Sequence, residues 1–293
     1  MQNDVVCLDS NSSSPTVTHV IPKGNYVAGV TSLGDDVFVV RSRSQQKIEV
    51  YDANTFTLRR HITVPGLYGS YWLAACPYKH CLYASDCNNN SVRRVDLSGS
   101  NAVMSWSVAR YPAGLSVNGD LSLLVVINGH PECKLQKFTT HGTLLQEIKL
   151  QADLACPHHA LLLPITGEYL VSHCHGALHR VCLVRHSNGS AICMYGGPQG
   201  SQLTQLNYPA GLAVDRERRV LVADRHNNRL LVIDQSLSSA HELSVGLDGG
   251  LKDPRTVWYD QARRRLYIGE WTGGRVIVID NLEDFSCKHI VSM

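Results

Sequence analysis

The sequence lacks the features that define several large classes of protein. Only 18% of its 293 residues are charged, and 27 Lys and Arg against 25 Asp and Glu leave a formal net charge of +2. Disordered chains combine low hydrophobicity with high net charge, so the 44% hydrophobic content and near-neutral balance exclude intrinsic disorder. The small net charge also argues against binding nucleic acid by overall charge, but it does not exclude a local basic face.

Long apolar runs and a recognisable leader are absent as well. No stretch approaches the ~18 consecutive apolar residues of a membrane-spanning helix, so we expect no membrane partner. The opening letters MQNDVVCLDSNSSS have no basic start and no apolar core, and therefore do not resemble a secretory signal. Helical periodicity is also rare. Short Val-, Ile- and Leu-rich segments, punctuated by Gly, Asn, Asp and Pro, predict an all-β protein instead.

The ten cysteines lie mostly inside predicted strands, where a reduced thiol behaves as a small hydrophobic group. A chain of this length can bury a core without disulfides, so we predict reduced thiols and a cytoplasmic location. Cys76 and Cys81 are an exception, because they flank a four-residue turn and could face each other across a hairpin. Sequons at Asn11, Asn89 and Asn188 would suit secretion, but such short motifs often arise by chance.

An internal repeat organises the chain. Tyr208–Asp234 (YPAGLAVDRERRVLVADRHNNRLLVID) and Asp253–Asp280 (DPRTVWYDQARRRLYIGEWTGGRVIVID) share Pro, a strand, a polar turn, a strand ending in an acid, a polar loop, Arg and a third strand. Further copies lie at Gly69–Gly99 and Tyr111–Phe138, and weaker ones at Tyr26–Asp52 and Cys156–Val184.

The spacing of the copies predicts the architecture. The residues that end the second strands are Arg41, Asp86, Asn128, His173, Asp224 and Glu270, with gaps of 45, 42, 45, 51 and 46 residues. A repeat of ~40–50 residues with four strands is typical of a propeller blade. We therefore predict one domain, a six-bladed β-propeller of four-stranded antiparallel blades at about 22–64, 65–109, 110–150, 151–197, 204–246 and 250–293.

The ring must close to cover its exposed edges. Residues 1–21 are predicted as the closing region, in which either Pro15–Ile21 or Asp4–Asp9 pairs at the joint. Phe285–Met293 is a further candidate, for the outer strand of the sixth blade.

The repeat resembles that of NHL propellers over nearly the whole chain. Asp224-Arg225-His226-Asn227-Asn228-Arg229 matches the family's D-x-x-N-N-R loop closely, and the segment from Asp86 to Arg93 matches it more loosely. Blades one, three and four depart from the pattern, because Arg41, Asn128 and His173 replace the acid. An acid that ends one strand can bind the Arg that starts the next and so hold the connecting loop.

The resemblance to the TRIM-NHL class implies a recognition module that is part of a larger regulator, with no catalytic residues, metal or cofactor of its own. In that class one face, here the top, binds single-stranded or hairpin RNA or protein partners. The top face carries the loops between blades and between second and third strands. Mixed Arg, Lys, Tyr, Trp and His suit base stacking and phosphate contact. The predicted binding residues are Arg43, Tyr71, Tyr111, His158, Tyr208, Arg225, His226, Lys252, Arg255 and Trp271.

RNA is the favoured partner of the module, which is expected to be monomeric. A protein-binding platform, such as one that recruits substrates to a ubiquitin ligase, is the alternative. The simpler interpretation is that these aromatic residues only pack between neighbouring blades. The opposite face carries basic hairpin turns at Arg216–Arg219 and Arg263–Arg265, for which solvation is the simpler interpretation.

An enzyme is the remaining alternative. Nothing resembles a nucleophile elbow, a P-loop or a dinucleotide-binding glycine motif. Similar propeller lyases hold zinc by histidines from several blades, and His130, His173 or His175, and His226 occupy comparable loops here. Blade four is also rich in His and Cys, from Cys156 to Cys182, but alternating strand residues point to opposite sides and cannot easily converge on zinc. We therefore predict no enzyme and no metal.

Overall fold

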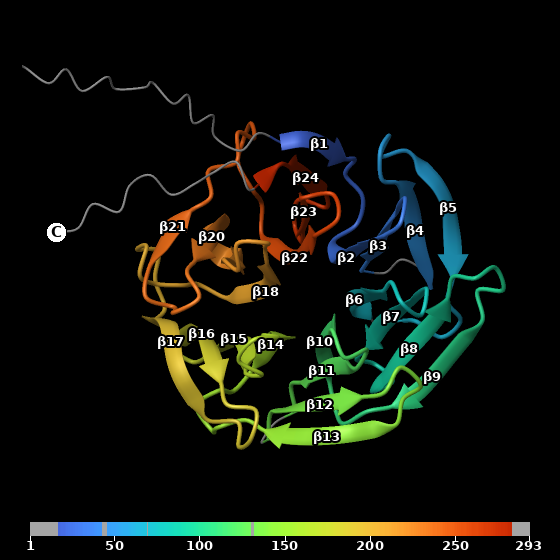
Figure 1. Cartoon of the computed structure of the whole chain (residues 1–293). Coiled ribbons are helices and arrows are strands. Elements are labelled where there is room, and N and C mark those ends of the chain that lie inside the picture. The colour runs from blue at the N-terminus through green and yellow to red at the C-terminus, as the bar shows by residue number, and fades with distance from the viewer. Residues whose placement is uncertain (1–16, 43–45, 69, 130–131, 283–293) are drawn as a thin grey trace, which may run out of the picture.

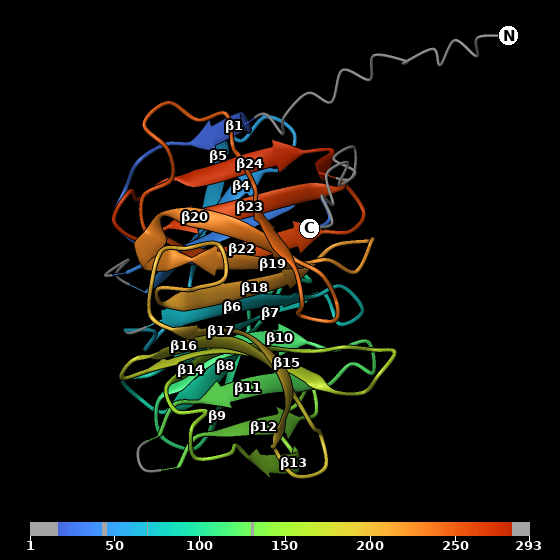
Figure 2. The same cartoon turned by 90° about the vertical axis from the view of Figure 1, so that its left-hand side faces the viewer.

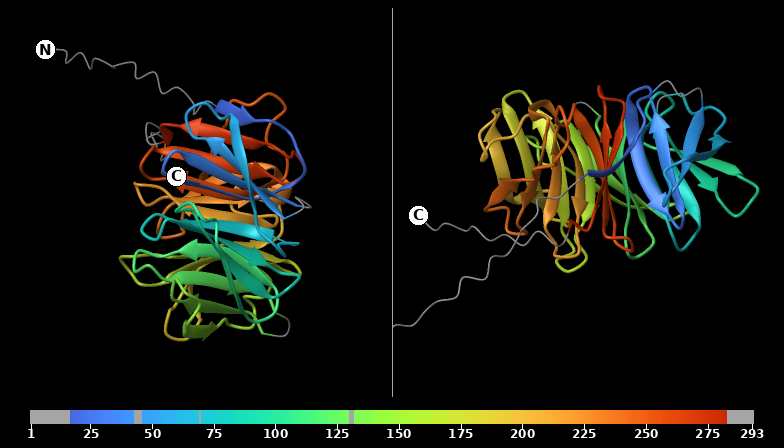
Figure 3. Two further views of the ribbon diagram at one scale, coloured as in Figure 1. Left: turned by 90° about the vertical axis from the view of Figure 1, so that its right-hand side faces the viewer. Right: turned by 90° about the horizontal axis from the view of Figure 1, so that it is seen from above.

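The structure, a computed structural model, describes residues 17–42, 46–68, 70–129 and 132–282 as six four-stranded antiparallel sheets arranged in a ring (Figure 1). The ring is a thick disc when seen from the side (Figures 2 and 3). The six-bladed, all-β prediction is therefore confirmed. Among the described residues, no helix is long and apolar enough to cross a bilayer.

Each blade runs from an inner strand to an outer one. The first three blades contain β2 (Val27–Leu33), β3 (Asp36–Arg41), β4 (Lys47–Asp52) and β5 (Leu58–Thr63); β6 (Ser70–Cys76), β7 (Cys81–Asp86), β8 (Ser91–Asp96) and β9 (Val103–Ser107); and β10 (Pro112–Val117), β11 (Leu123–Ile127), β12 (Lys134–Phe138) and β13 (Leu144–Lys149).

The last three blades contain β14 (Pro157–Leu162), β15 (Tyr169–His175), β16 (Leu178–Val184) and β17 (Ala191–Pro198); β18 (Pro209–Val214), β19 (Val220–Asp224), β20 (Arg229–Ile233) and β21 (Ala240–Glu242); and β22 (Pro254–Asp260), β23 (Arg265–Glu270), β24 (Val276–Asp280) and β1 (Val17–Ile21). A 3-10 turn, η1 (Arg225–Asn227), joins β19 to β20.

The first described strand closes the ring. β1 pairs antiparallel with β24, with Ile21 opposite Val276, and takes the outer position of the sixth blade. Of the alternatives at the joint, the segment at 15–21 thus contains the pairing strand. The candidates at 4–9 and 285–293 lie outside the described residues.

The core lies between the blades rather than inside any one of them. Six clusters of buried hydrophobic side chains fill the six spaces between neighbouring sheets, and each draws residues from both. Because every sheet is covered on both faces, the middle strands contain nearly continuous runs of buried residues, as in β11 and β20. Cys76 and Cys81 lie opposite each other across the β6–β7 hairpin as predicted, and both are free, buried thiols.

Candidate functional site

The centre of the ring is closed by side chains at one equivalent position of the six inner strands. Two residues after the start of pairing, these strands carry in order Gly29, Trp72, Gly114, His159, Gly211 and Thr256. Small and larger residues therefore alternate around the ring. A Cβ on Gly114 would lie 2.5 Å from the His158 carbonyl oxygen, so only glycine allows the third and fourth blades to approach this closely.

Trp72 and His159 fill the space beside these glycines. Their rings lie 4.6 Å apart between centroids, and each side chain is 4% exposed. The imidazole also joins three blades, because the Leu212 N–H donates to Nδ1 (3.1 Å) and Nε2 lies 3.2 Å from the Leu115 carbonyl oxygen. Nε2 must therefore carry the proton. Burial lowers the pKa of His159 to about 4, so the ring is neutral at physiological pH.

A hollow of about 470 Å³ opens on the top face above this closure. Trp72 forms part of its base. The hollow is lined, besides Trp72, by Cys87, Asn88, Tyr111, Pro112, Ala113, Asn128, His158, Tyr208, Ala210, Arg225, Arg255 and Trp271. We call it the top-face pocket.

Tyr208 is the centre of a stack of rings and cations in this pocket. His158 lies 4.5 Å from it and His226 4.6 Å, between ring centroids, and the Arg225 guanidinium carbon is 5.0 Å from the Tyr208 centroid. Burial and the charges of Arg255 and Arg225 lower the pKa of His158 to about 3. This imidazole is therefore a neutral, planar surface at physiological pH.

Trp271 extends the stack across the sixth blade. It stacks on Tyr26 at 5.1 Å, and the guanidinium carbons of Arg255 and Arg225 lie 4.3 and 5.6 Å from its centroid. Arg225 thus spans two aromatic rings. It is also paired with Asp253, whose carboxylate accepts bonds from Nε and, at 3.1 Å, from Nη2. Part of its positive charge is therefore neutralised within the protein.

The ion pair between an acid and an arginine that the repeat predicts holds the loop between β19 and β20, which begins with Arg225. Arg229 Nε donates to Asp224 Oδ2 at 2.7 Å, and its other nitrogens reach the carbonyl oxygens of Ser201, Gln202 and Gln205. One guanidinium thereby ties the β19–β20 turn to the segment that enters the blade. Because Arg225 follows Asp224 directly in the chain, this contact also fixes the backbone position of Arg225.

The same contact recurs in other blades with different residues. It joins Arg93 to Asp86 at 3.3 Å and Arg275 to Glu270 at 2.7 Å. In the first blade the polarity is reversed, because Arg41 occupies the acid's position and binds Glu49 at 2.8 Å. An ion pair therefore joins the second and third strands even in a blade that departs from the family pattern.

Most of the predicted binding residues come together. Tyr111, His158, Tyr208, Arg225, Arg255 and Trp271 line the pocket, and His226 stacks beside Tyr208. Lys252 is exposed on the same face and does not line the pocket. Arg43 and the side chain of Tyr71 lie outside the described set. The sequence interpretation missed Trp72 and Asn128. Trp72 occupies the position that Gly114 and Gly211 occupy in other copies of the repeat, so an alignment of the copies would have identified Trp72.

The histidines and cysteines of blade four are engaged in separate contacts. His158 Nε2 lies 3.1 Å from Cys174 Sγ, while His173 Nε2 accepts a bond from Arg180 Nε at 3.1 Å. Burial, with the Arg180 charge, lowers the pKa of His173 to about 4, and burial raises that of Cys174 to about 12. Among the described residues, no three His, Cys, Asp or Glu side chains converge as a metal site would need.

Comparison with known proteins supports the fold. A model of the NHL repeat matches residues 206–233, in the fifth blade. The structure of hydrazine synthase from Kuenenia stuttgartiensis is similar at a TM-score of 0.66 and 14% identity, covering 89% of this chain and 97% of that one. The structure of a streptogramin B lyase is similar at a TM-score of 0.64 and 14% identity, and the match covers 89% of this chain and 81% of that one. A catalytically inactive variant of virginiamycin B lyase from Staphylococcus aureus, in a structure with quinupristin, is similar at a TM-score of 0.63 and 12% identity. That match covers 90% of this chain and 86% of the lyase chain.

No curated protein sequence matches the chain. The structural similarities, all at low identity, concern the fold. Together with the repeat match they define the class: a six-bladed β-propeller that contains an NHL repeat at residues 206–233. A fold of this kind hosts many unrelated functions, so function has to be argued from the site.

Proposed function

We propose that the chain is a non-catalytic recognition module whose top-face pocket binds single-stranded RNA. The observation that carries this proposal is the continuous stack of Tyr208 and Trp271 with Arg225 and Arg255 around a hollow of about 470 Å³. Aromatic rings accept bases of any sequence on their faces, and guanidinium groups add cation–π and phosphate contacts. This would place the chain among post-transcriptional regulators of the TRIM-NHL kind.

The exposed groups around the pocket support the same partner. Tyr111 is 52% exposed at the pocket wall, with the Arg110 guanidinium carbon 5.4 Å from its ring centroid. Arg255 and the exposed Lys252 come from the segment that begins the sixth blade. Bases would therefore stack on Tyr111, Tyr208 and Trp271, while phosphates would lie near Arg255 and Lys252.

Neutralising Arg255 and Lys252 together, as Arg255→Gln/Lys252→Gln, is expected to weaken RNA binding about twenty-five-fold at 0.1 M salt. Each lost phosphate contact removes about 0.7 from the slope of log affinity against log salt, which is about fivefold at that salt concentration. The measurement is fluorescence anisotropy of a labelled, randomised single-stranded RNA of ten nucleotides between 50 and 200 mM salt. Tyr111→Ala is expected to cost about tenfold, with the salt slope unchanged.

The matched control carries the same charge change on the other face. Arg218→Gln/Arg264→Gln removes two exposed arginines from hairpin turns opposite the pocket and is expected to leave the affinity unchanged. Weak, salt-insensitive binding that is equal in wild type and Arg255→Gln/Lys252→Gln would rule out the proposal. So would an equal loss in both double variants.

A further inference from the structure

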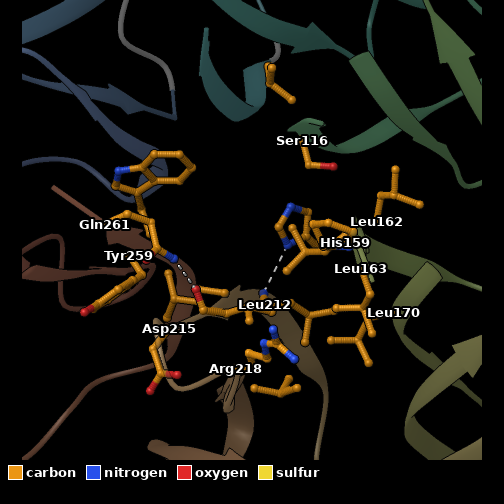
Figure 4. A pocket seen from close by; sticks show the side chains of 18 of the residues that line it. Ser116, His159, Leu162, Leu163, Leu170, Leu212, Asp215, Arg218, Tyr259 and Gln261 are labelled. Carbon is orange, nitrogen blue, oxygen red and sulfur yellow. Dashed lines mark hydrogen bonds between the residues drawn. The ribbon is translucent and has the colours of Figure 1, made fainter. Parts of the chain in front are cut away.

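A second cavity, of about 450 Å³, opens on the opposite face of the ring, below Trp72 and His159. It lies where the inner strands β10, β14, β18 and β22 reach their hairpin turns (Figure 4). We call it the hairpin-face cavity. Its lining includes Val117, His159, Leu163, Leu212, Asp215 and Arg218. Trp72 lines both hollows and so separates this cavity from the top-face pocket.

The walls of the cavity are apolar side chains that the protein leaves partly uncovered. Leu161, Leu162, Leu163 and Val117 line it and are only half-buried, and Ile165 at the adjoining turn is 66% exposed. Figure 4 shows Leu162, Leu163 and Leu170 on one side of the cavity and Leu212 near its middle, below His159. Apolar side chains that face a hollow of this size gain free energy when an apolar ligand displaces water from them.

The closed end of the cavity offers no vacant hydrogen-bond donor from its polar side chains, His159 and Ser116. Both ring nitrogens of His159 are used by Leu115 and Leu212, and the imidazole is neutral. The Ser116 hydroxyl donates to the Ala160 carbonyl oxygen at 2.9 Å. The deep part of the cavity is therefore suited to hydrocarbon.

The rim is different, because it carries Arg218, whose charge has no counter-ion among the residues that the structure describes. The Asp215 carboxylate accepts bonds from the backbone N–H and Nε of Arg219, at 2.8 and 2.6 Å, and is 3% exposed. Arg216 donates to the Gln261 carbonyl oxygen. In the part of the chain that the structure describes, the Arg218 guanidinium makes neither an ion pair nor a hydrogen bond, although Arg218 lines the cavity.

We propose that the hairpin-face cavity binds a small amphipathic anion with an apolar body and a terminal carboxylate. The carboxylate meets the Arg218 guanidinium at the rim, in the bidentate geometry that arginine favours. The apolar body lies along Leu163 and Leu212 towards His159. The cavity volume is within the range of ~300–1,000 Å³ typical of small-molecule sites. This inference does not depend on RNA binding at the other face.

The probes are decanoate, 1-decanol with the same chain but no charge, and decyltrimethylammonium with the opposite charge. Isothermal titration calorimetry is expected to show decanoate bound about tenfold more tightly than 1-decanol, since a hydrogen bond to a charged group adds at least this much. Decyltrimethylammonium is expected to bind more weakly than either.

Arg218→Gln is expected to reduce decanoate affinity about tenfold and leave 1-decanol affinity unchanged. The matched control is Arg264→Gln. Arg264 is also exposed and occupies the corresponding turn position in the next hairpin, with φ 53° against 65° for Arg218, but does not line the cavity. It is expected to change neither affinity. Val117→Phe, which fills part of the cavity, is expected to weaken decanoate and 1-decanol alike.

Three results would overturn the proposal. They are the absence of saturable decanoate binding below its micellar concentration, an equal loss of affinity in Arg218→Gln and Arg264→Gln, and loss of decanoate binding in Tyr111→Ala, which alters only the top-face pocket. Because Arg218 is exposed at a hairpin tip, its variant tests the site even if Val117→Phe does not fold.

Discussion

Replacing Arg229 with methionine is expected to lower the free energy of unfolding by about 3–5 kcal/mol, the cost of leaving a buried carboxylate without its cation. Asp224 is fully buried, and Arg229 Nε is 2.7 Å from its Oδ2. The variant also leaves the carbonyl oxygens of Ser201 and Gln202 without their donor. Equilibrium denaturation with urea measures the change.

The control is an ion pair of similar length at the surface. Lys137 Nζ lies 2.6 Å from Asp120 Oδ2, but the Asp120 side chain is 50% exposed, so Lys137→Met is expected to cost less than about 1 kcal/mol. If Arg229→Met lowered the free energy of unfolding no more than Lys137→Met, the Asp224–Arg229 contact would stabilise the fold no more than a surface ion pair does. Because Arg225 directly follows Asp224, Arg229→Met is also expected to loosen the top-face pocket and weaken RNA binding.

Lowering the pH from 7 to 5 is expected to remove about 6 kcal/mol of stability through His158, His159 and His173. Burial holds the pKa of His158 at about 3 and those of His159 and His173 at about 4, whereas an unfolded histidine titrates near 6.5. Between these values the unfolded chain binds more protons than the folded one, so stability falls as the pH drops through this window. Each histidine contributes about 2 kcal/mol by pH 5, at 1.36 kcal/mol per pH unit.

Urea denaturation of wild type and His159→Gln at both pH values tests this. The variant is expected to lose about 2 kcal/mol less than wild type between pH 7 and pH 5, whatever its stability at pH 7. His80→Gln, in an exposed hairpin turn, is the matched control and is expected to keep the wild-type difference. A full wild-type pH dependence in His159→Gln would show that His159 is not the group responsible.

The fold could be predicted from the sequence because each blade repeats one local pattern. The residues that end the second strands, such as Asp86, Asp224 and Glu270, fix the register of every copy. The top-face pocket followed from the same alignment, since equivalent loops of a ring meet on one face. This is why Tyr111, Tyr208 and Trp271 were predicted together and lie around one hollow.

Contacts between blades were harder to predict, because no local pattern encodes them. Arg225 binds Asp253, 28 residues away in the next blade, and a motif within one repeat does not contain this pair. The hairpin-face cavity was missed for a related reason. Half-buried leucines such as Leu161 and Leu163 look like ordinary core residues in the sequence, and only the assembled ring shows that they face a hollow.

The pairing of β1 with β24 also affects how the chain is made. Thr18 donates to the carbonyl oxygen of Val278, so two segments 260 residues apart must meet before the sixth sheet is complete. β1 leaves the ribosome before its partner strand, because the strands of the other blades lie between the two in the sequence. During translation β1 therefore has an unpaired edge while the intervening blades are synthesised, and the ring closes only after β24 has emerged.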